Sequence, residues 1–89
     1  MPYIKDDNQR RRILDPTVGV SEPRRAQDVG ELNFQISRLL DDYVVRKGKR
    51  YENINAVMGV MSSAQAEFYR RVAAPYEDTK IRENGDVYE

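Results

Sequence analysis

The sequence contains no cysteine and no histidine among its 89 residues. Without cysteine the chain has no disulfide, no zinc–thiolate site and no thiol nucleophile. Without histidine it lacks the side chain that most often serves as a general base or a metal ligand. No other nucleophile–base or acid–base constellation is visible. We therefore expect a protein that is not an enzyme and that holds no metal and no cofactor.

An excess of charge is also missing, because 15 lysine and arginine residues face 15 aspartate and glutamate residues. No overall field draws the protein to nucleic acid or to an anionic membrane. The two halves differ, however. Residues 1–50 carry 11 basic and 8 acidic side chains, a net +3, and residues 51–89 carry 4 and 7, a net −3. Opposite halves could attract within one chain or between two, although salt screens so small an imbalance.

Long hydrophobic runs are absent as well. The N-terminal residues MPYIKDDNQRRR include no apolar segment of signal-peptide length. The longest uncharged, apolar-rich run covers residues 54–66 and is too short and too polar to span a bilayer. These features predict a soluble, cytoplasmic protein that makes no contact with a membrane.

The first third of the chain, residues 1–27, predicts a mostly irregular N-terminal arm. Asp6 could cap a short helical turn that runs to Leu14. The arginine run at positions 10–12 is interpreted as solvated surface. A continuous helix or an inner strand is opposed by three residues of the segment DPTVGVSEPRR: Pro16, Gly19 and Pro23.

The remaining residues, 28–89, predict a helical domain, so the whole chain is expected to form one all-α domain. The motif D-x-x-E that begins at Asp28 caps the first helix, and Gly48 stops it. Phe34 and Val45 lie on a side stripe that needs another cover, from the N-terminal arm or from a second subunit. The main apolar face recurs at helical spacing: Leu32, Ile36, Leu39, Leu40 and Tyr43.

A second main helix begins between residues 50 and 54 and is expected to run antiparallel to the first. Its apolar face contains Ile54, Val57, Met58, Met61, Ala64, Phe68 and Val72. Residues 54–66 carry no charge on any side, which is typical of a helix buried all round. The opposite side is a stripe of small residues: Ala56, Gly59, Ser63 and Ala66. This small-residue stripe predicts either a core contact or a symmetric interface in a homo-oligomer, in the simplest case a dimer.

The C-terminal residues predict a short third helix after a bend. Pro75 cannot continue the second helix without a clash one turn back, but it suits the start of a new helix. Gly85 suits the end of that helix, and Tyr76 and Ile81 are its expected apolar contacts. The two arginines before the bend are interpreted as partners of Glu67 or of the acids after the bend. This structural polar cluster contains Arg70, Arg71, Glu77 and Asp78.

The densest basic cluster lies in the turn between the two main helices: Arg46, Lys47, Lys49 and Arg50. These side chains could contact phosphates, which would make the protein a nucleic-acid-binding accessory protein. Solvated lysines ordinarily lie in turns, however. The second helix is also uncharged where a recognition helix presents side chains to base edges, apart from Asn53 and Asn55. Nucleic-acid binding is therefore the alternative, and contact with protein is favoured.

Several segments resemble a family of short proteins from bacteriophage and bacterial genomes that has no assigned function. They are MPYIK, GELNF, YENINAVMGV and EFYRRVAAPYEDTKIRENGDVY, which together extend the resemblance over nearly the whole chain. This sequence departs most between Thr17 and Gln27, where Gly19 and Pro23 interrupt a helix expected in relatives. The resemblance implies a phage or prophage origin, and hence the host cytoplasm, but no catalytic residue. We expect a small phage-type protein that self-associates or docks onto another protein.

Overall fold

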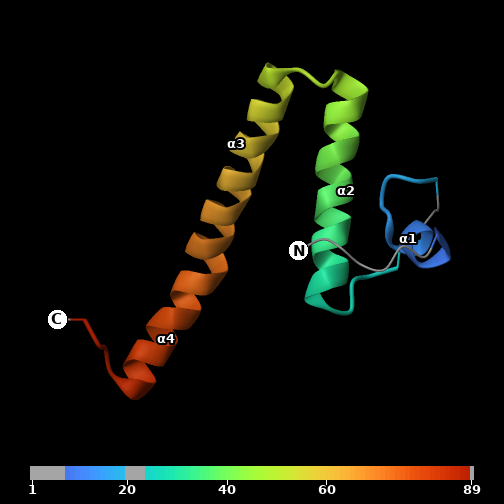
Figure 1. The fold of residues 1–89 in the computed structure, drawn as a ribbon. Helices are drawn as coiled ribbons and strands as arrows, with labels where there is room; N and C mark the ends of the chain where they lie inside the picture. Colours follow the sequence, from blue (N-terminus) through green and yellow to red (C-terminus); the bar gives the residue numbers. More distant parts are fainter. Residues whose placement is uncertain (1–7, 20–23, 89) are drawn as a thin grey trace. The chain divides into compact units, whose positions relative to one another are not determined.

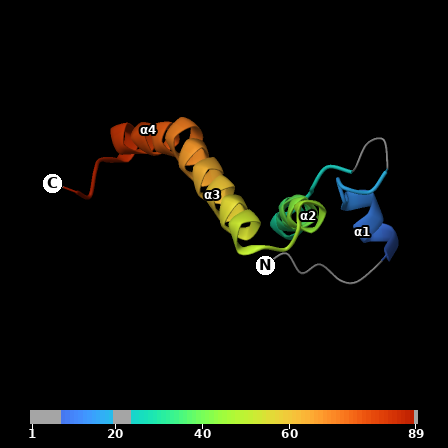
Figure 2. The ribbon, with the colours of Figure 1, turned by 90° about the horizontal axis from the view of Figure 1, so that it is seen from above.

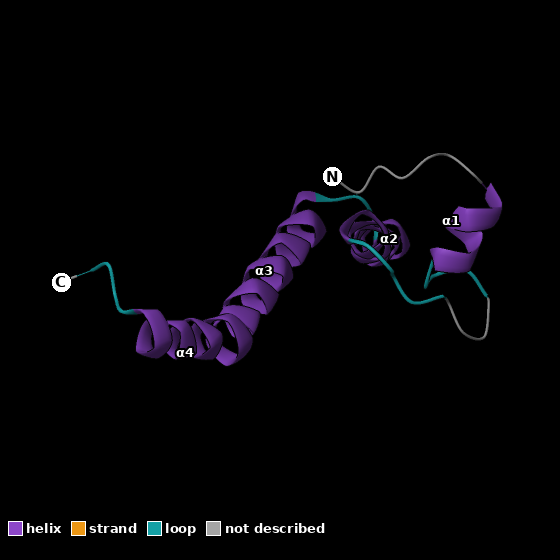
Figure 3. Cartoon of the chain, turned by 90° about the horizontal axis from the view of Figure 1, so that it is seen from below, coloured by secondary structure: helices purple, strands orange, loops and turns teal. Residues whose placement is uncertain are grey.

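The computed structural model of the chain describes residues 8–19 and 24–88. Helices make up most of these residues, and they include no strand (Figure 3). The prediction of an all-α fold is confirmed. The helical segments, in chain order (Figure 1), are α1 (Asn8–Leu14), α2 (Val29–Lys47), α3 (Tyr51–Phe68), the π-helix η1 (Tyr69–Ala73) and α4 (Ala74–Asn84).

The chain divides into two units, residues 1–54 and residues 55–89. The first unit contains α1, α2 and the start of α3, and the second contains the rest of α3 with η1 and α4. Among the described residues, Val57 is the one buried side chain of the second unit, and all others belong to the first. They are Leu14, Asp15, Glu31, Phe34 and Val44.

Both ends of α2 are fixed by the local sequence. Asp28 is the N-cap, and its side chain accepts a hydrogen bond of 2.8 Å from the Glu31 backbone N–H. The Glu31 carboxylate in turn accepts a bond of 2.9 Å from the backbone N–H of Gln27, one residue before the cap. At the other end Gly48 adopts a φ of 112° and donates to Val44 O. The predicted cap and the predicted stop are both confirmed.

The short helix α1 packs against α2 (Figure 2) and covers the Phe34 end of its side stripe. Leu14 is completely buried, and Phe34 is only 7% exposed beside it. The Arg11 guanidinium lies over the Phe34 ring, 5.8 Å from its centroid. The N-terminal arm is therefore the cover that Phe34 required, whereas Val45 is exposed. The helix predicted to end at Leu14 does so, while Asp6 lies outside the described residues.

Gln35 anchors the loop that follows α1. Its side-chain amide donates to Leu14 O at 3.0 Å and to Arg24 O at 2.7 Å. The Arg24 backbone N–H donates to Ile13 O at 2.9 Å, which closes the loop upon itself. One side chain of α2 thus satisfies two carbonyls of a segment that has no regular hydrogen-bond ladder.

The main apolar face predicted for α2 is mostly uncovered, contrary to expectation. The arm is short and lies over the Phe34 side, and a chain of this length cannot cover every face of its helices. Leu40 is half-buried, and the other four residues of the face are exposed: Leu32, Ile36, Leu39 and Tyr43.

The bend predicted at Pro75 is confirmed, and Pro75 lies in the first turn of α4, but α4 is joined to α3 through η1 and is not a separate helix. Proline lacks an N–H, and its ring crowds the carbonyl one turn earlier. The chain widens just before it instead: the Ala74 N–H bonds to Tyr69 O, five residues back. The helix axis changes direction there (Figures 2 and 3). The predicted end at Gly85 is confirmed, with a φ of 85°.

The second unit is a stretch of helix without a core of its own. Val57 is its single buried residue in the described part of the chain. Tyr76 and Ile81 were expected to contact the body of the protein, but both are exposed. That expectation is wrong because α4 continues the long helix instead of folding back from a break at Pro75.

Candidate functional site

The Glu31 carboxylate is the centre of a polar cluster between the N-terminal arm and α2. Glu31 is only 3% exposed. Arg10 and Arg24 both donate to its Oε2 atom, at 2.9 and 2.5 Å, while Gln27 donates to Oε1. The arginine run was interpreted as solvated surface, which is wrong for Arg10. The folded arm brings this residue to a buried carboxylate 21 positions away.

These donors hold the pKa of Glu31 below its usual range. The largest cause is the backbone hydrogen bond from Gln27, followed by the hydrogen bond from Arg10. Burial acts in the opposite direction and raises the pKa. The hydrogen bonds and the charges of Arg24 and Arg10 together outweigh this effect of burial. The carboxylate is therefore ionised at neutral pH and acts as a fixed acceptor.

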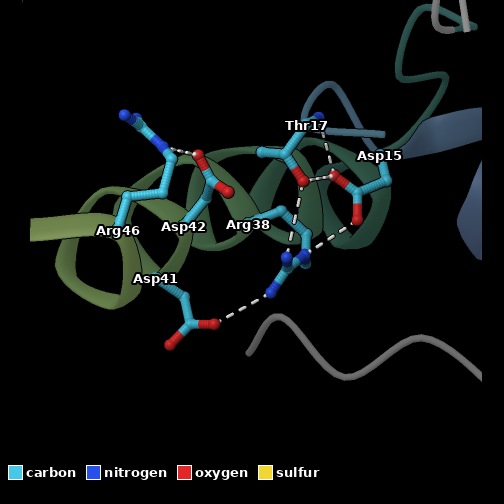
Figure 4. A network of polar contacts seen from close by, with 6 residues as sticks. All are labelled: Asp15, Thr17, Arg38, Asp41, Asp42 and Arg46. Atoms are coloured by element: carbon cyan, nitrogen blue, oxygen red, sulfur yellow. Dashed lines mark hydrogen bonds and ion pairs between the residues drawn. The ribbon is translucent and has the colours of Figure 1, made fainter. Parts of the chain in front are cut away.

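A second polar cluster is centred on Arg38 of α2 (Figure 4). The Arg38 guanidinium donates to Asp15 Oδ2 at 2.8 Å and to Asp41 Oδ2 at 2.9 Å. Thr17 donates to Asp15 Oδ1 from its hydroxyl at 2.6 Å and from its backbone N–H at 2.9 Å. The cluster fastens the loop after α1 to the middle of α2.

Each pKa that folding shifts in the described residues moves further from pH 7. Burial raises the pKa of Asp15, but the hydrogen bonds from Thr17 and Arg38 prevail and leave it below its usual value. The hydrogen bond to Asp15 raises the pKa of Arg38. The nearby Glu77 carboxylate raises the pKa of the Tyr69 hydroxyl. None of these shifted groups is tuned for proton transfer near pH 7.

The acidic side chains of the described residues do not gather around a common point. Asp41 and Asp42 bond separately to Arg38 and Arg46, so the two carboxylates diverge (Figure 4). Nowhere in residues 8–19 and 24–88 do three acidic groups come close enough to hold a metal ion. Within the same residues, the helices are all too short or too polar to cross a membrane.

The basic turn between α2 and α3 is partly neutralised by neighbouring acids. Arg46 Nε lies 2.8 Å from Asp42 Oδ2, and Arg50 Nη1 lies 3.7 Å from Glu52 Oε1. Both pairs are largely exposed. The turn thus presents fewer uncompensated charges than its sequence suggests. Its four basic residues are all exposed: Arg46, Lys47, Lys49 and Arg50.

Asn53 has a structural task in this turn. Its side-chain amide donates to Gly48 O at 2.8 Å and to Lys47 O at 3.3 Å. These bonds satisfy carbonyls that the end of α2 leaves without helical partners. Asn53 is therefore held against the turn, while Asn55, two residues further along α3, is exposed.

The small-residue stripe of α3 is open. A methyl group added at Gly59 would meet no atom within 4 Å outside the adjacent helix backbone. Val60 and Met61, next to the stripe, are exposed too. This surface therefore has room for an incoming chain. All four residues of the stripe are exposed: Ala56, Gly59, Ser63 and Ala66.

The two arginines of the C-terminal polar cluster share one acidic partner. Arg70 Nη2 lies 2.8 Å from Glu67 Oε2, and Arg71 Nη1 lies 3.7 Å from Glu67 Oε1. Both arginines therefore pair with Glu67, and these two ion pairs do not involve the acids beyond Pro75. The arginine side chains are 71% and 69% exposed, so both are accessible to another molecule.

The π-helix decides which residues of the C-terminal segment meet. The Glu77 carboxylate, eight residues further along, raises the pKa of the Tyr69 hydroxyl. In an unbroken α-helix two such positions lie about 80° apart around the axis. The wider turn of η1 removes much of this offset, so the two side chains influence each other. Lys80 lies over the Tyr76 ring at 5.5 Å on the following turn.

Sequence reasoning missed the residues that hold the arm in place: Arg10, Arg24, Gln35 and Arg38. The available signal was the D-x-x-E motif, which marks Glu31 as an acid in a fixed position. Nothing in the spacing shows which cations reach it, because its partners lie 21 and 7 residues away on irregular backbone.

Taken together, these features define a small all-α protein. Polar contacts hold its N-terminal arm against α2, and its second unit is helix without a core of its own. The chain belongs to the family described as Domain of unknown function (DUF6899), which matches residues 1–87. The comparisons with curated proteins and with solved structures found no match. Family membership agrees with the resemblance to proteins that have no assigned function.

Proposed function

We propose that this protein is a small, non-enzymatic protein that acts by self-association through its long helix. The resemblance to short phage proteins supports a phage or prophage origin and a place in the host cytoplasm. Docking onto a different protein is the second way in which the same surface can act, and the experiment below separates the two.

The observation that carries this proposal is the missing core of residues 55–89. Isolated helices are marginal in water, and most helical stability in proteins comes from the packing of an apolar face. In this unit Val57 is buried, and every other described residue is exposed or half-exposed. A second copy would supply the packing that the unit lacks.

The composition of α3 supports the same conclusion. Residues 53–66 carry no charge although nearly all of them are exposed. The absence of charge on every side is typical of a helix that is buried all round. The exposed apolar side chains here include Met58, Val60 and Met61. Contiguous exposed apolar surface of this kind marks interaction sites.

Replacing Gly59 with arginine should convert the self-associated protein to a species of lower mass. Arginine is a better helix former than glycine by roughly 1 kcal/mol, and the position has open space in the single chain. The variant helix is therefore at least as stable, and a loss of association can be ascribed to the surface. Sedimentation velocity at high micromolar concentration measures the mass, and circular dichroism checks the helix content.

Gly19→Arg is the matched control, because Gly19 also has open space but lies in the arm. It should leave the mass unchanged. A monomeric wild-type protein across the whole concentration range would show that self-association is wrong. Binding of a different protein to wild type, but not to the Gly59→Arg variant, would then favour docking.

Nucleic-acid binding through the basic turn is the alternative, and Lys47 and Lys49 favour it because both are exposed cations of the same turn. The pairing of Arg46 with Asp42 and of Arg50 with Glu52 reduces the charge available for phosphates. We therefore place this function below self-association.

Under the proposal, the protein should show no binding to single- or double-stranded DNA or RNA at low salt, measured by fluorescence anisotropy. Binding that weakens steeply with salt would contradict this expectation. In that case neutralising Lys47, Lys49 and Arg50 should reduce the slope of log Kobs against log salt by roughly 2–3, because each phosphate contact contributes about 0.7–0.9.

A further inference from the structure

The segment from Phe68 to Ile81 exposes aromatic and apolar side chains. One open hollow of about 490 Å³ borders Phe68 and Tyr69, and another of about 340 Å³ borders Tyr76 and Ile81. Aromatic residues and arginine are enriched at the energetic centres of protein interfaces. Five large apolar or aromatic side chains of this segment are exposed: Phe68, Tyr69, Val72, Tyr76 and Ile81.

The length of α2 prevents it from covering the segment from Phe68 to Ile81. An α-helix rises about 1.5 Å per residue, so the 19 residues of α2 span about 28 Å and the 18 residues of α3 about 27 Å. Three residues, 48–50, connect the two helices. Even if α2 were laid fully along α3, it would end near Phe68. The helix beyond that point therefore lies outside the reach of α2.

The charges of the segment are arranged with inverted symmetry around Ala74. Arg71 precedes Ala74 by three residues, and Glu77 follows it by three. Arg70 and Asp78 lie four residues away on either side. Reversing the direction of the segment about Ala74 therefore places a carboxylate at the level of each arginine. A parallel copy in register would instead place like charges at the same level.

We propose that a second copy of the chain docks on this segment in antiparallel orientation, with a two-fold axis next to Ala74. Arg70 and Arg71 of each copy then face Asp78 and Glu77 of the other. The present partner of both arginines is the exposed Glu67, and exposed ion pairs are weak. The arginines are therefore available to the second copy.

The small residues around Ala74 fit the same arrangement. The residues at the centre of the contact, Ala73, Ala74 and Pro75, are small and let the two helices approach closely.

A second copy explains the pattern better than an unrelated partner. In a two-fold contact residue i of one copy meets residue j of the other, and j meets i. This symmetry requires charges of opposite sign at equal distances from the axis, which is the arrangement around Ala74. An unrelated partner imposes no such symmetry.

The contact is separate from the small-residue stripe around Gly59, so the inference goes beyond the proposed function. Two different two-fold contacts on one chain build a particle larger than a dimer. We therefore expect the wild-type protein to be a tetramer or a larger assembly at high micromolar concentration.

A charge exchange tests the contact. The acidic variant combines Arg70→Glu with Arg71→Glu, and the basic variant combines Glu77→Arg with Asp78→Arg. Each variant alone sets like charges against each other, and the mass of its particle should fall by half or more. Mixing the two variants should restore the wild-type mass, since every facing pair again has opposite signs. Sedimentation velocity gives the masses, and native mass spectrometry shows whether both variants share one particle.

The outcomes separate this inference from the proposed function. If both charge variants keep the wild-type mass while Gly59→Arg lowers it, the second contact is wrong and self-association through α3 stands. If the charge variants dissociate and Gly59→Arg does not, the contact at Ala74 is correct and the α3 stripe is wrong. Dissociation that mixing does not reverse also overturns the antiparallel contact.

Single cysteines test the orientation, because the chain has no other cysteine. Ala74→Cys lies next to the proposed axis and should form a disulfide-linked dimer under mild oxidation. Thr79→Cys lies five residues away, so its two copies are separated by about 15 Å along an antiparallel pair and should not link. A cross-link at Thr79→Cys, or none at Ala74→Cys, would overturn the proposed orientation.

Discussion

Replacing Phe34 with alanine should lower the free energy of unfolding by about 3 kcal/mol. The Phe34 ring is 7% exposed and fills the contact between the fully buried Leu14 and the Arg11 guanidinium. Removing a buried aromatic ring costs about 3–5 kcal/mol. We take the lower end because this core is small and its neighbours can relax. Urea denaturation followed by circular dichroism measures the change.

Leu39→Ala on the exposed face of α2 is the control for this prediction. Leu39 is exposed, and surface substitutions usually change stability by about 0.5 kcal/mol or less. The two variants therefore compare the covered side of α2 with its uncovered side. Equal stability of Phe34→Ala and Leu39→Ala would contradict the packing of the arm on α2.

Replacing Glu31 with glutamine should produce the largest loss among the polar substitutions. The change keeps the shape but removes the charge that pairs with Arg10 and Arg24. The glutamine amide also places an NH₂ group where Arg10, Arg24 or the Gln27 N–H needs a hydrogen-bond acceptor. Thermal unfolding at neutral pH should show a lower melting temperature than that of any variant of an exposed pair.

The same substitution should change the response to acid. Folding lowers the pKa of Glu31 from about 4.5 and that of Asp15 from about 3.8. Stability from a lowered pKa is present above the unfolded value and is lost as the pH falls through the folded value. Wild type should therefore lose stability progressively below about pH 4.5, and Glu31→Gln should lose less.

The melting temperatures of the two proteins should consequently converge as the pH is lowered from 7 to 3. Glu67→Gln provides the control, because Glu67 also pairs with two arginines but is largely exposed. It should follow the wild-type pH profile closely. A constant gap between wild type and Glu31→Gln down to pH 3 would show that the ionised carboxylate is not what Glu31 contributes.

The helix ends could be predicted from the sequence because their causes are local. Asp28 accepts a bond from a residue three positions away, and Gly48 and Gly85 adopt positive φ values that other residues avoid. Each of these features needs only a few consecutive residues. The all-α fold follows in the same way from periodicity and caps.

The polar clusters could not be predicted, because their partners are distant in sequence. Arg10 reaches Glu31 across 21 residues, and Arg38 reaches Asp15 across 23. Arginine and acidic residues are abundant throughout the chain, so composition does not select these pairs. The path of the irregular arm decides them.

Pro75 shows both the strength and the limit of local reasoning. Its missing N–H and its ring determine that a regular α-helix must be disturbed near this point. Whether the chain breaks or widens depends on what the following residues can pack against. No core is present there, so the helix continues through η1 into α4, and Tyr76 and Ile81 are exposed.

The sequence by itself determined where helices begin and end, since capping and backbone conformation act within a few residues. Only the tertiary structure decided which side of α2 is covered. Periodicity favoured the stripe of Leu32 and Ile36, but Phe34 is buried instead. The physical reason is that the buried side depends on where Gln35 and Arg38 fasten the arm, and hydrophobicity along one helix contains no information on that contact.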